Sequence, residues 1–380
     1  MVEIVIGGDV CPINRNAGTF HGGDASGLFS DLLTEFRRAD LAVVNLECPL
    51  IEGGRSVAKV GPTLRAEPVG IVSLSKAHIG VVNLANNHIL DYGAAGLLST
   101  RSACARAGIA VVGVGADERE ARRPIIREVG GVRVGLLAYA ESEAVTAGVQ
   151  TGGVSVLNLA EYVRSLRLRR NWFDSLIVLL HAGVQHYPYP SPMLQETCRF
   201  MVEEGADIVV CQHSHCPGAV EKYQKGHIVY GQGNLLFDRY PHRSGSFYHG
   251  FLVRVLLEAG LPARVELVPY HQSDQLPGAR RMGAPQAERF LAEVREISAR
   301  VQDVEFVREQ WHQLCERKRY DLYSTLNGHG RVARFLNRRL RFSDWCFDKT
   351  RLLNLHHLIS CDSHREALET LLAIDLEVRR

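Results

Sequence analysis

The sequence has no apolar run as long as the ~18 residues that a membrane-spanning helix needs, so we predict no transmembrane segment. Its first residues lack the basic segment of a secretory signal, which favours a cytoplasmic protein. None of the nine cysteines forms a CxxC pair, so the sequence indicates neither a disulfide framework nor a thiolate zinc site. A strong charge of one sign is also missing. The formal net charge is only +2, which excludes attraction of nucleic acid by the whole surface and leaves any preference for anions to local patches.

The hydrophobic residues that are present, 46% of 380, are enough to bury a large core. In the first part of the chain, β-branched runs at residues 2–8, 41–47 and 79–85 alternate with helical periods, which is typical of βαβ units. A second α/β half follows, with strands predicted at residues 175–181 and 206–212 and hairpin strands behind them. We therefore expect an α/β fold with two packed sheets and helices on their outer faces.

The pattern changes near residue 275, where HQSDQLPGARRMGAPQ is rich in glycine, proline and polar residues. We predict a main domain over residues 1–275 and a helical appendage over residues 276–380, with helices at 287–302 and 361–380. Between them, RVARFLNRRLRF (331–342) carries five arginines and no acidic residue among apolar side chains. This segment predicts either an amphipathic face for a membrane surface, a phosphate or a polyanion, or a solvated face that caps the main domain.

The most informative feature of the sequence is a set of polar residues that directly follow β-like apolar runs. Asp9 ends IGGDV, Glu47 ends LAVVNLE, and His181 ends SLIVLLH. Ligands gather at the carboxyl ends of strands in α/β sheets, so we expect these side chains at one edge. Two neighbouring carboxylates repel each other unless a cation or a shared proton offsets the charge, and a metal is the simplest explanation. Taken alone, Asp9 could instead be a cap or turn residue, Glu47 a surface loop residue, and His181 a buried core side chain.

LANNHILDYG (84–93) is the strongest single motif, because an apolar strand that ends in amides and an imidazole must find partners for them. We assign Asn87 as a neutral oxygen ligand. We assign His88 as an acid or a hydrogen-bond donor to the transition state, with Asp91 orienting its ring. The alternative for Asn86 and Asn87 is a turn in the left-handed conformation.

CQHSHC (211–216) supplies two more imidazoles. In an extended segment, His213 and His215 lie on the same side, roughly 6 to 7 Å apart at the α-carbon, so both reach one metal or two adjacent ones. The hard oxygen ligands elsewhere favour Mn, Mg, Zn or Fe over a sulfur-coordinated ion. Four further residues are predicted to contact substrate or to support the site: Gln185, His186, Asn45 and Asn234.

In order and spacing, these motifs resemble the capsule-synthesis protein CapA family, associated with poly-γ-glutamate production, which is similar in fold to the calcineurin-like metallophosphoesterases. The resemblance covers residues 1 to about 270 and rests on GGDV, NLECPL, LANNHILDYG, HAGVQHY, EEGADIVVCQHSHCPGAVEKY and IVYGQGNLLFD. It implies a four-layer α/β/β/α sandwich. It also implies a centre of one or two divalent ions held by six residues: Asp9, Glu47, Asn87, His181, His213 and His215.

The chain departs from the related patterns at three places. Cys11 stands where the phosphoesterases have the histidine of a DxH motif, so the metal position nearest Asp9 would be weak or empty. Gln185 stands where the CapA pattern usually has an acid. Cys211 and Gln212 replace a Gly-His pair, which is a milder change.

These residues predict a metal-dependent hydrolase or transferase that acts at a phosphoryl or acyl-type centre of an anionic small molecule or polymer. The alternative is a non-catalytic accessory factor of capsule or poly-γ-glutamate synthesis that binds an anionic polymer or its precursor, with the metal only holding the site. A purely structural metal domain is a third hypothesis. We expect no nucleic-acid partner, and the sequence leaves the oligomeric state open.

Overall fold

The computed structural model describes residues 1–57, 59, 61–141, 153–169, 171–242, 245–258, 260–326, 330–360 and 372. The chain divides into two compact units, Met1–Val304 and Glu305–Arg380. The helix α9 (Ala284–Val301) belongs to the first unit, and our boundary near residue 275 stays a prediction about domain organisation. The helix expected over 361–380 lies outside the described residues, apart from residue 372.

Two sheets form the centre of the first unit. In the first sheet the strand order is β14-β13-β12-β1-β2-β3-β4, and β11 also pairs with β1. Its strands are β1 (Val2–Cys11), β2 (Leu41–Leu46), β3 (Val81–Asn83), β4 (Ala110–Val112), β11 (Asn234–Phe237), β12 (His249–Leu257), β13 (Arg264–Gln272) and β14 (Ala279–Arg281). In the second sheet the order is β5-β6-β7-β8-β10-β9. Its strands are β5 (Ile125–Val129), β6 (Val132–Ala140), β7 (Ser175–His181), β8 (Ile208–Gln212), β9 (Val220–Tyr223) and β10 (Gly226–Val229).

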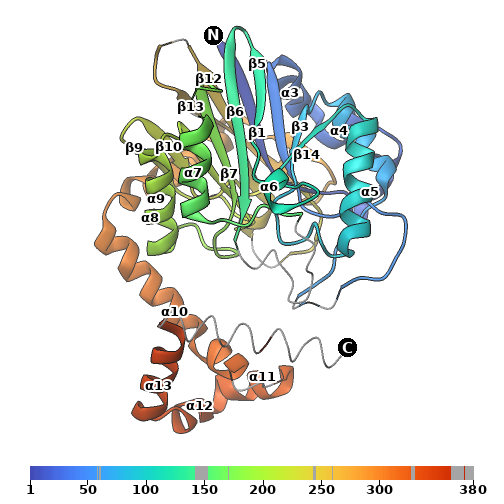
Figure 1. Cartoon of the computed structure of the whole chain (residues 1–380). Coiled ribbons are helices and arrows are strands. Elements are labelled where there is room, and N and C mark those ends of the chain that lie inside the picture. Colours follow the sequence, from blue (N-terminus) through green and yellow to red (C-terminus); the bar gives the residue numbers. More distant parts are fainter. Residues whose placement is uncertain are drawn as a thin grey trace. The chain divides into compact units, whose positions relative to one another are not determined.

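Helices cover the outer faces of both sheets, which gives the four layers that we predicted (Figure 1). On the first sheet, α3 contacts β1 and α5 contacts β4. On the second sheet, α8 contacts β8 and β10, while α9 touches β9 of one sheet and β13 of the other. The helices of this unit are α1 (Ala17–His21), α2 (Ala25–Phe29), α3 (Leu33–Arg38), α4 (Ile71–Lys76), α5 (Gly93–Arg106), α6 (Glu118–Ala121), α7 (Leu159–Arg169), α8 (Pro192–Glu203) and α9.

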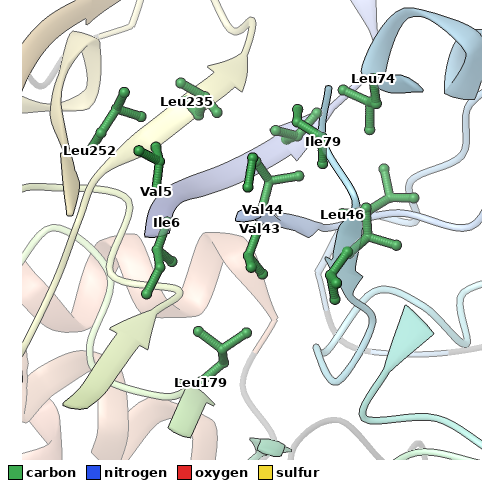
Figure 2. Packing of buried hydrophobic residues seen from close by; sticks show 14 of the residues in the cluster. Val5, Ile6, Val43, Val44, Leu46, Leu74, Ile79, Leu179, Leu235 and Leu252 are labelled. Atoms are coloured by element: carbon green, nitrogen blue, oxygen red, sulfur yellow. The ribbon is translucent and has the colours of Figure 1, made fainter. Parts of the chain in front are cut away.

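The apolar core fills the space between the sheets and beneath the helices. Alternate side chains of a strand point to opposite faces, so Ile6 and Val43 point toward Leu179 of the second sheet (Figure 2). On the other face of the same strands, Val5 and Val44 point away from the second sheet (Figure 2). Because both faces of β1 and β2 are covered, these strands are buried along nearly their whole length, as parallel strands usually are.

Parallel pairing brings the ends of distant strands to one edge. Within the first sheet, β1, β2 and β3 run parallel, with Asp9 beside Asn45 and Asn45 beside Asn83. Within the second sheet, β6, β7 and β8 run parallel, with His181 beside Gln212. The carboxyl ends of these strands therefore carry the predicted site residues, as the sequence led us to expect.

Two local features depend on short stretches of chain. The strands β5 and β6 form a hairpin, with Gly130 and Gly131 at positive φ in its turn. Asn234 begins the short strand β11, which pairs with β1. A four-residue strand in the middle of a sheet has too short a pattern to stand out in the sequence, and its parallel partner β1 is more than two hundred residues away.

Gly8 is where β1 and the start of β11 approach most closely. A Cβ at residue 8 would lie 2.0 Å from the carbonyl oxygen of Gly233, so backbone would have to move. We predict that Gly8→Ala lowers the free energy of unfolding by about 3 kcal/mol in urea titrations. Gly18→Ala is the control, because a Cβ there meets nothing within 4 Å. Equal stability of the two variants would contradict the close packing of β1 against Gly233.

The second unit is helical in its described part. Its helices are α10 (Val304–Leu326), which starts at the last residue of the first unit, α11 (Arg331–Leu340), α12 (Phe342–Cys346) and α13 (Lys349–Ser360). Among the residues that the structure describes, we find no helix that combines the length and the apolar character needed to cross a bilayer.

Candidate metal centre

Asp9 lies in the first sheet between two asparagines, since its register partners are Asn45 on β2 and Asn234 on β11. Asn45 Nδ2 donates to Asp9 Oδ1 at 2.8 Å, and the backbone N–H of His213 donates to Oδ2 at 3.4 Å. Burial alone would raise the pKa of Asp9, but the hydrogen bond and the charge of His215 outweigh it and lower the pKa. Asp9 is thus held as an ionised carboxylate.

Two groups of candidate ligands share Glu47. In the first group, Glu47, His181 and His213 each offer one atom, and these atoms lie within 4.8 Å of one another. In the second group, Asp9 and His215 join Glu47 within the same limit. Glu47 Oε1 lies 3.5 Å from His181 Nε2 and 3.7 Å from His215 Nε2. One carboxylate oxygen therefore stands between both groups, where a ligand shared by two cations would be.

Asn87 completes the first group. Its Oδ1 lies 3.1 Å from His181 Nε2, and the same nitrogen lies 3.1 Å from His213 Nδ1. An amide oxygen, a carboxylate and two imidazoles form a donor set suited to hard and borderline divalent cations. The structure thus brings all six predicted ligands to one place.

The carboxylate of Glu47 is the most unusual group of the site. It is 0% exposed, and within the described part of the chain neither of its oxygens accepts a hydrogen bond. Burial and the negative charge of Asp9 raise the pKa of Glu47 to about 8. A buried carboxylate without donors is costly, and a divalent cation would remove that cost by binding both oxygens' lone pairs directly. The residues present therefore fit a cation.

The surroundings of the two histidines of the HxH motif shift their pKa values in opposite directions. Burial lowers the pKa of His215, but the charge of Glu47 and the contact with Asp9 outweigh it and raise the pKa to about 9. Burial and the charges of His181 and His215 lower the pKa of His213 well below its usual range. His213 is therefore a neutral imidazole ready to coordinate, whereas cation binding at His215 would displace a proton.

The HxH motif reaches the site by a route that we did not predict. The strand β8 ends at Gln212, so His213 and His215 do not belong to an extended segment. They have φ angles of 107° and 52°, in the region that side-chain-bearing residues rarely adopt. Their ring centroids are 5.9 Å apart. A strained turn, rather than the alternation of a strand, turns both imidazoles into the site, and such strain is typical of functional positions.

His88 and Asp91 form a buried pair next to the ligands. His88 Nδ1 lies 2.7 Å from Asp91 Oδ2, and because a carboxylate only accepts, the nitrogen donates. Nδ1 of His88 therefore carries a hydrogen, and Nε2 takes no part in this bond. The same carboxylate accepts from the Leu64 N–H and from Lys59 Nζ, each at 2.6 Å. Asp91 is therefore fixed from three directions.

Lys59 contacts two of the candidate site residues and was not predicted from the sequence. Its ammonium group also donates to the carbonyl oxygen of Asn87 at 2.6 Å, and its side chain is largely buried. The only signal in the sequence was a lysine in the polar loop before the second helix, which is ordinary for a surface loop. The contact arises because the backbone of that loop is tied to Asp91, whose carbonyl oxygen accepts from the Val57 N–H.

The predicted substrate contacts fall into two classes. Asn45 and Asn234 are fully buried, and Asn234 Oδ1 lies 2.8 Å from His215 Nδ1. Of the two roles predicted for them, their burial favours support of the site, because an amide without exposed surface cannot touch a substrate and both contact candidate ligands. Gln185 and His186 are exposed, and the His186 ring centroid lies 6.4 Å from that of His215. Those two stay predictions as substrate contacts.

Cys11 does not replace the missing histidine ligand. It is buried in the hydrophobic core, where burial and the neighbouring Cys48 thiol raise its pKa well above its usual range. A neutral thiol is a poor ligand, since the thiolate is the form that binds metals. The group of Asp9, Glu47 and His215 therefore offers three side-chain ligands.

The sequence is similar to proteins of bacterial capsule synthesis. The family model described as bacterial capsule synthesis protein PGA_cap matches residues 3–239. The capsule biosynthesis protein CapA of Bacillus anthracis is 28% identical over 246 residues, which cover 62% of this chain and 58% of that protein. The PGA biosynthesis protein CapA of Bacillus subtilis strain 168 is 26% identical over 257 residues, 67% of either chain.

Two further proteins are similar over little more than half of their own length. A probable polyglutamine synthesis accessory protein of Mycobacterium tuberculosis is 32% identical over 212 residues, 52% of this chain and 56% of that protein. The chain thus spans less than two thirds of the Bacillus anthracis and Mycobacterium tuberculosis relatives. Among solved structures, a 5'-nucleotidase precursor from Thermus thermophilus is similar with a TM-score of 0.43 and 15% identity, over 77% of this chain and 57% of that one.

Proposed function

Because this chain belongs to the bacterial capsule synthesis protein family PGA_cap, we propose that it is a metal-dependent phosphoester hydrolase or transferase in the synthesis of a capsule or poly-γ-glutamate-type polymer. The names of its relatives concern capsule and PGA biosynthesis, which supports this setting. The substrate would be an anionic small molecule or polymer precursor. Mn, Zn, Mg and Fe are the divalent ions that the donor set suits.

The observation that carries the proposal is the Glu47 carboxylate, buried without a hydrogen bond between two groups of ligand atoms. A structural ion pair would leave its oxygens satisfied by protein donors. Within the described residues no donor reaches these oxygens, which supports a bound cation as their partner. A bound divalent ion would supply acidification of a water molecule and polarisation of a phosphoryl oxygen.

The side chains around the ligands have separate tasks in this proposal. His88 donates a proton to the leaving group through the ring nitrogen that does not face Asp91. Asp91 orients the imidazole, and Lys59 holds Asp91 in place. Asn45 keeps the Asp9 carboxylate turned toward the ligands.

The test is purified protein assayed with Mn²⁺ on generic phosphomonoesters and phosphodiesters, beside His213→Ala. Removing a ligand from the first group should lower bound metal per chain and reduce turnover by about 10³-fold. The control is His227→Ala, because His227 pairs with Ile208 at the opposite end of the second sheet. Equal turnover in wild type and His213→Ala would remove the proposal.

One observation favours a second function, that of a non-catalytic accessory factor that binds an anionic polymer or its precursor. With Cys11 buried beside Cys48, the second ligand group has three side-chain members, whereas the first group has four when Asn87 is included. A single ion could then hold the site without completing a catalytic pair. Binding of metal and of poly-γ-glutamate by the wild type, without turnover of any phosphoester, would favour this function over the enzyme.

A further inference from the structure

We propose that α11 and the following helix α12 bind the surface of an anionic lipid bilayer. The inference is independent of the metal centre and goes beyond the function proposed above. It starts from four apolar residues of α11 that recur at helical spacing and so form one stripe: Val332, Phe335, Leu336 and Leu340. Val332 is 74% exposed, Leu340 is 69% exposed, and Trp345 on α12 is 89% exposed.

The helix packs through its polar side. Asn337 is 0% exposed, accepts from the Ser343 N–H at 2.9 Å, and donates to the carbonyl oxygen of Tyr320 at 3.2 Å. A helix that folds against its own domain normally buries the apolar face and exposes the polar one. Here the arrangement is reversed, so packing within the described part of the second unit does not explain the apolar stripe.

The charged residues around the apolar stripe indicate which partner binds it. α11 and the residue after it contain five arginines and no acid: Arg331, Arg334, Arg338, Arg339 and Arg341. Arg338 is paired with Asp321, and the Arg339 guanidinium lies over the Phe335 ring at 5.2 Å. An anionic bilayer satisfies both features together, because lipid phosphates bind the arginines while the apolar side chains enter the acyl boundary.

Other occupants match only part of this surface. A dissolved polyanion would use the arginines but has no use for exposed leucine, phenylalanine and tryptophan side chains. A second copy of the helix would cover the stripe but would bring its arginines against like charges. Arginine beside phenylalanine, with tryptophan next to them, is the composition of a helix that lies in the headgroup region.

The experiment is co-sedimentation of the full chain with vesicles. The protein should sediment with phosphatidylcholine vesicles that contain phosphatidylglycerol and should stay in solution with pure phosphatidylcholine. Leu336→Ser/Leu340→Ser and Arg331→Gln/Arg339→Gln should each weaken the partition coefficient roughly tenfold or more. The melting temperature of both variants should match the wild type, because the four side chains are exposed.

Leu261→Ser is the matched control, since Leu261 is an exposed leucine in the turn between β12 and β13. It should sediment like the wild type. Equal sedimentation with both kinds of vesicle would overturn the proposal. So would a leucine variant that still binds like the wild type while only the arginine variant fails, because that result describes a polyanion site. A lower melting temperature of the leucine variant would show that the stripe is covered within the protein, and this too would overturn it.

Discussion

Replacing Glu47 with glutamine should weaken Mn²⁺ binding by about 100-fold or more without destabilising the metal-free protein. Both ligand groups depend on this carboxylate, so both should fail together. In the metal-free state its oxygens have no donors in the described structure, and burial and the charge of Asp9 raise its pKa to about 8, so the carboxyl group is largely protonated at neutral pH. A neutral amide of the same shape then replaces a neutral carboxyl group and should leave the free energy of unfolding nearly unchanged.

The measurements are calorimetric titration with Mn²⁺ and thermal unfolding with and without the ion. The wild type should melt at a higher temperature in saturating Mn²⁺, whereas Glu47→Gln should not respond. Glu221→Gln is the matched control, because Glu221 is equally buried but accepts from Arg199 and from the Tyr230 hydroxyl. It should lose about 3 kcal/mol of stability and keep its Mn²⁺ affinity. If instead Glu47→Gln loses stability and keeps its Mn²⁺ affinity, Glu47 is a structural residue.

His88→Gln should reduce turnover of the best phosphoester substrate by about 10²- to 10⁴-fold while bound metal per chain stays unchanged. The imidazole is held by Asp91 at 2.7 Å rather than by the ligand groups, so its loss removes a proton donor and leaves the donor set intact. Metal analysis of the purified variant and steady-state kinetics measure the two effects separately.

His227→Gln serves as the control for the loss of an imidazole, since His227 lies near the start of β10 at the far end of the second sheet. It should have wild-type turnover. If His88→Gln loses its metal, His88 belongs to the ligand set. If it keeps full turnover, the leaving group is protonated by another residue.

Much of the site could be predicted because strand ends have a local signature. Asp9, Glu47 and His181 each follow an apolar run that can only be a buried strand, and parallel strands bring their carboxyl ends together. The HxH histidines lie beside the other candidate ligands, but not for the reason that we expected. Alternation along a strand was expected, whereas a turn with positive φ angles orients them.

Contacts between loops could not be predicted in this way. Lys59 meets Asp91 because a loop folds back over the site, and no periodic pattern marks that return. Asn234 lies beside Asp9 because the four-residue strand β11 pairs with β1, which is far from it in the sequence. The packing of α11 could not be predicted either. The sequence pattern indicates that its apolar stripe is buried, but in the structure the helix packs through Asn337 on its polar side.

The sequence by itself determined the family, the α/β layers and the six candidate ligands. The periodicity of hydrophobic residues and the polar residues at strand ends are both recognisable within short segments of the chain. Only the tertiary structure decided that Glu47 lies between both ligand groups without a hydrogen bond, that Asn45 and Asn234 are hidden behind the ligands, and that Cys11 is turned into the core. These facts depend on the register and packing of strands far apart in sequence, which a local pattern does not contain.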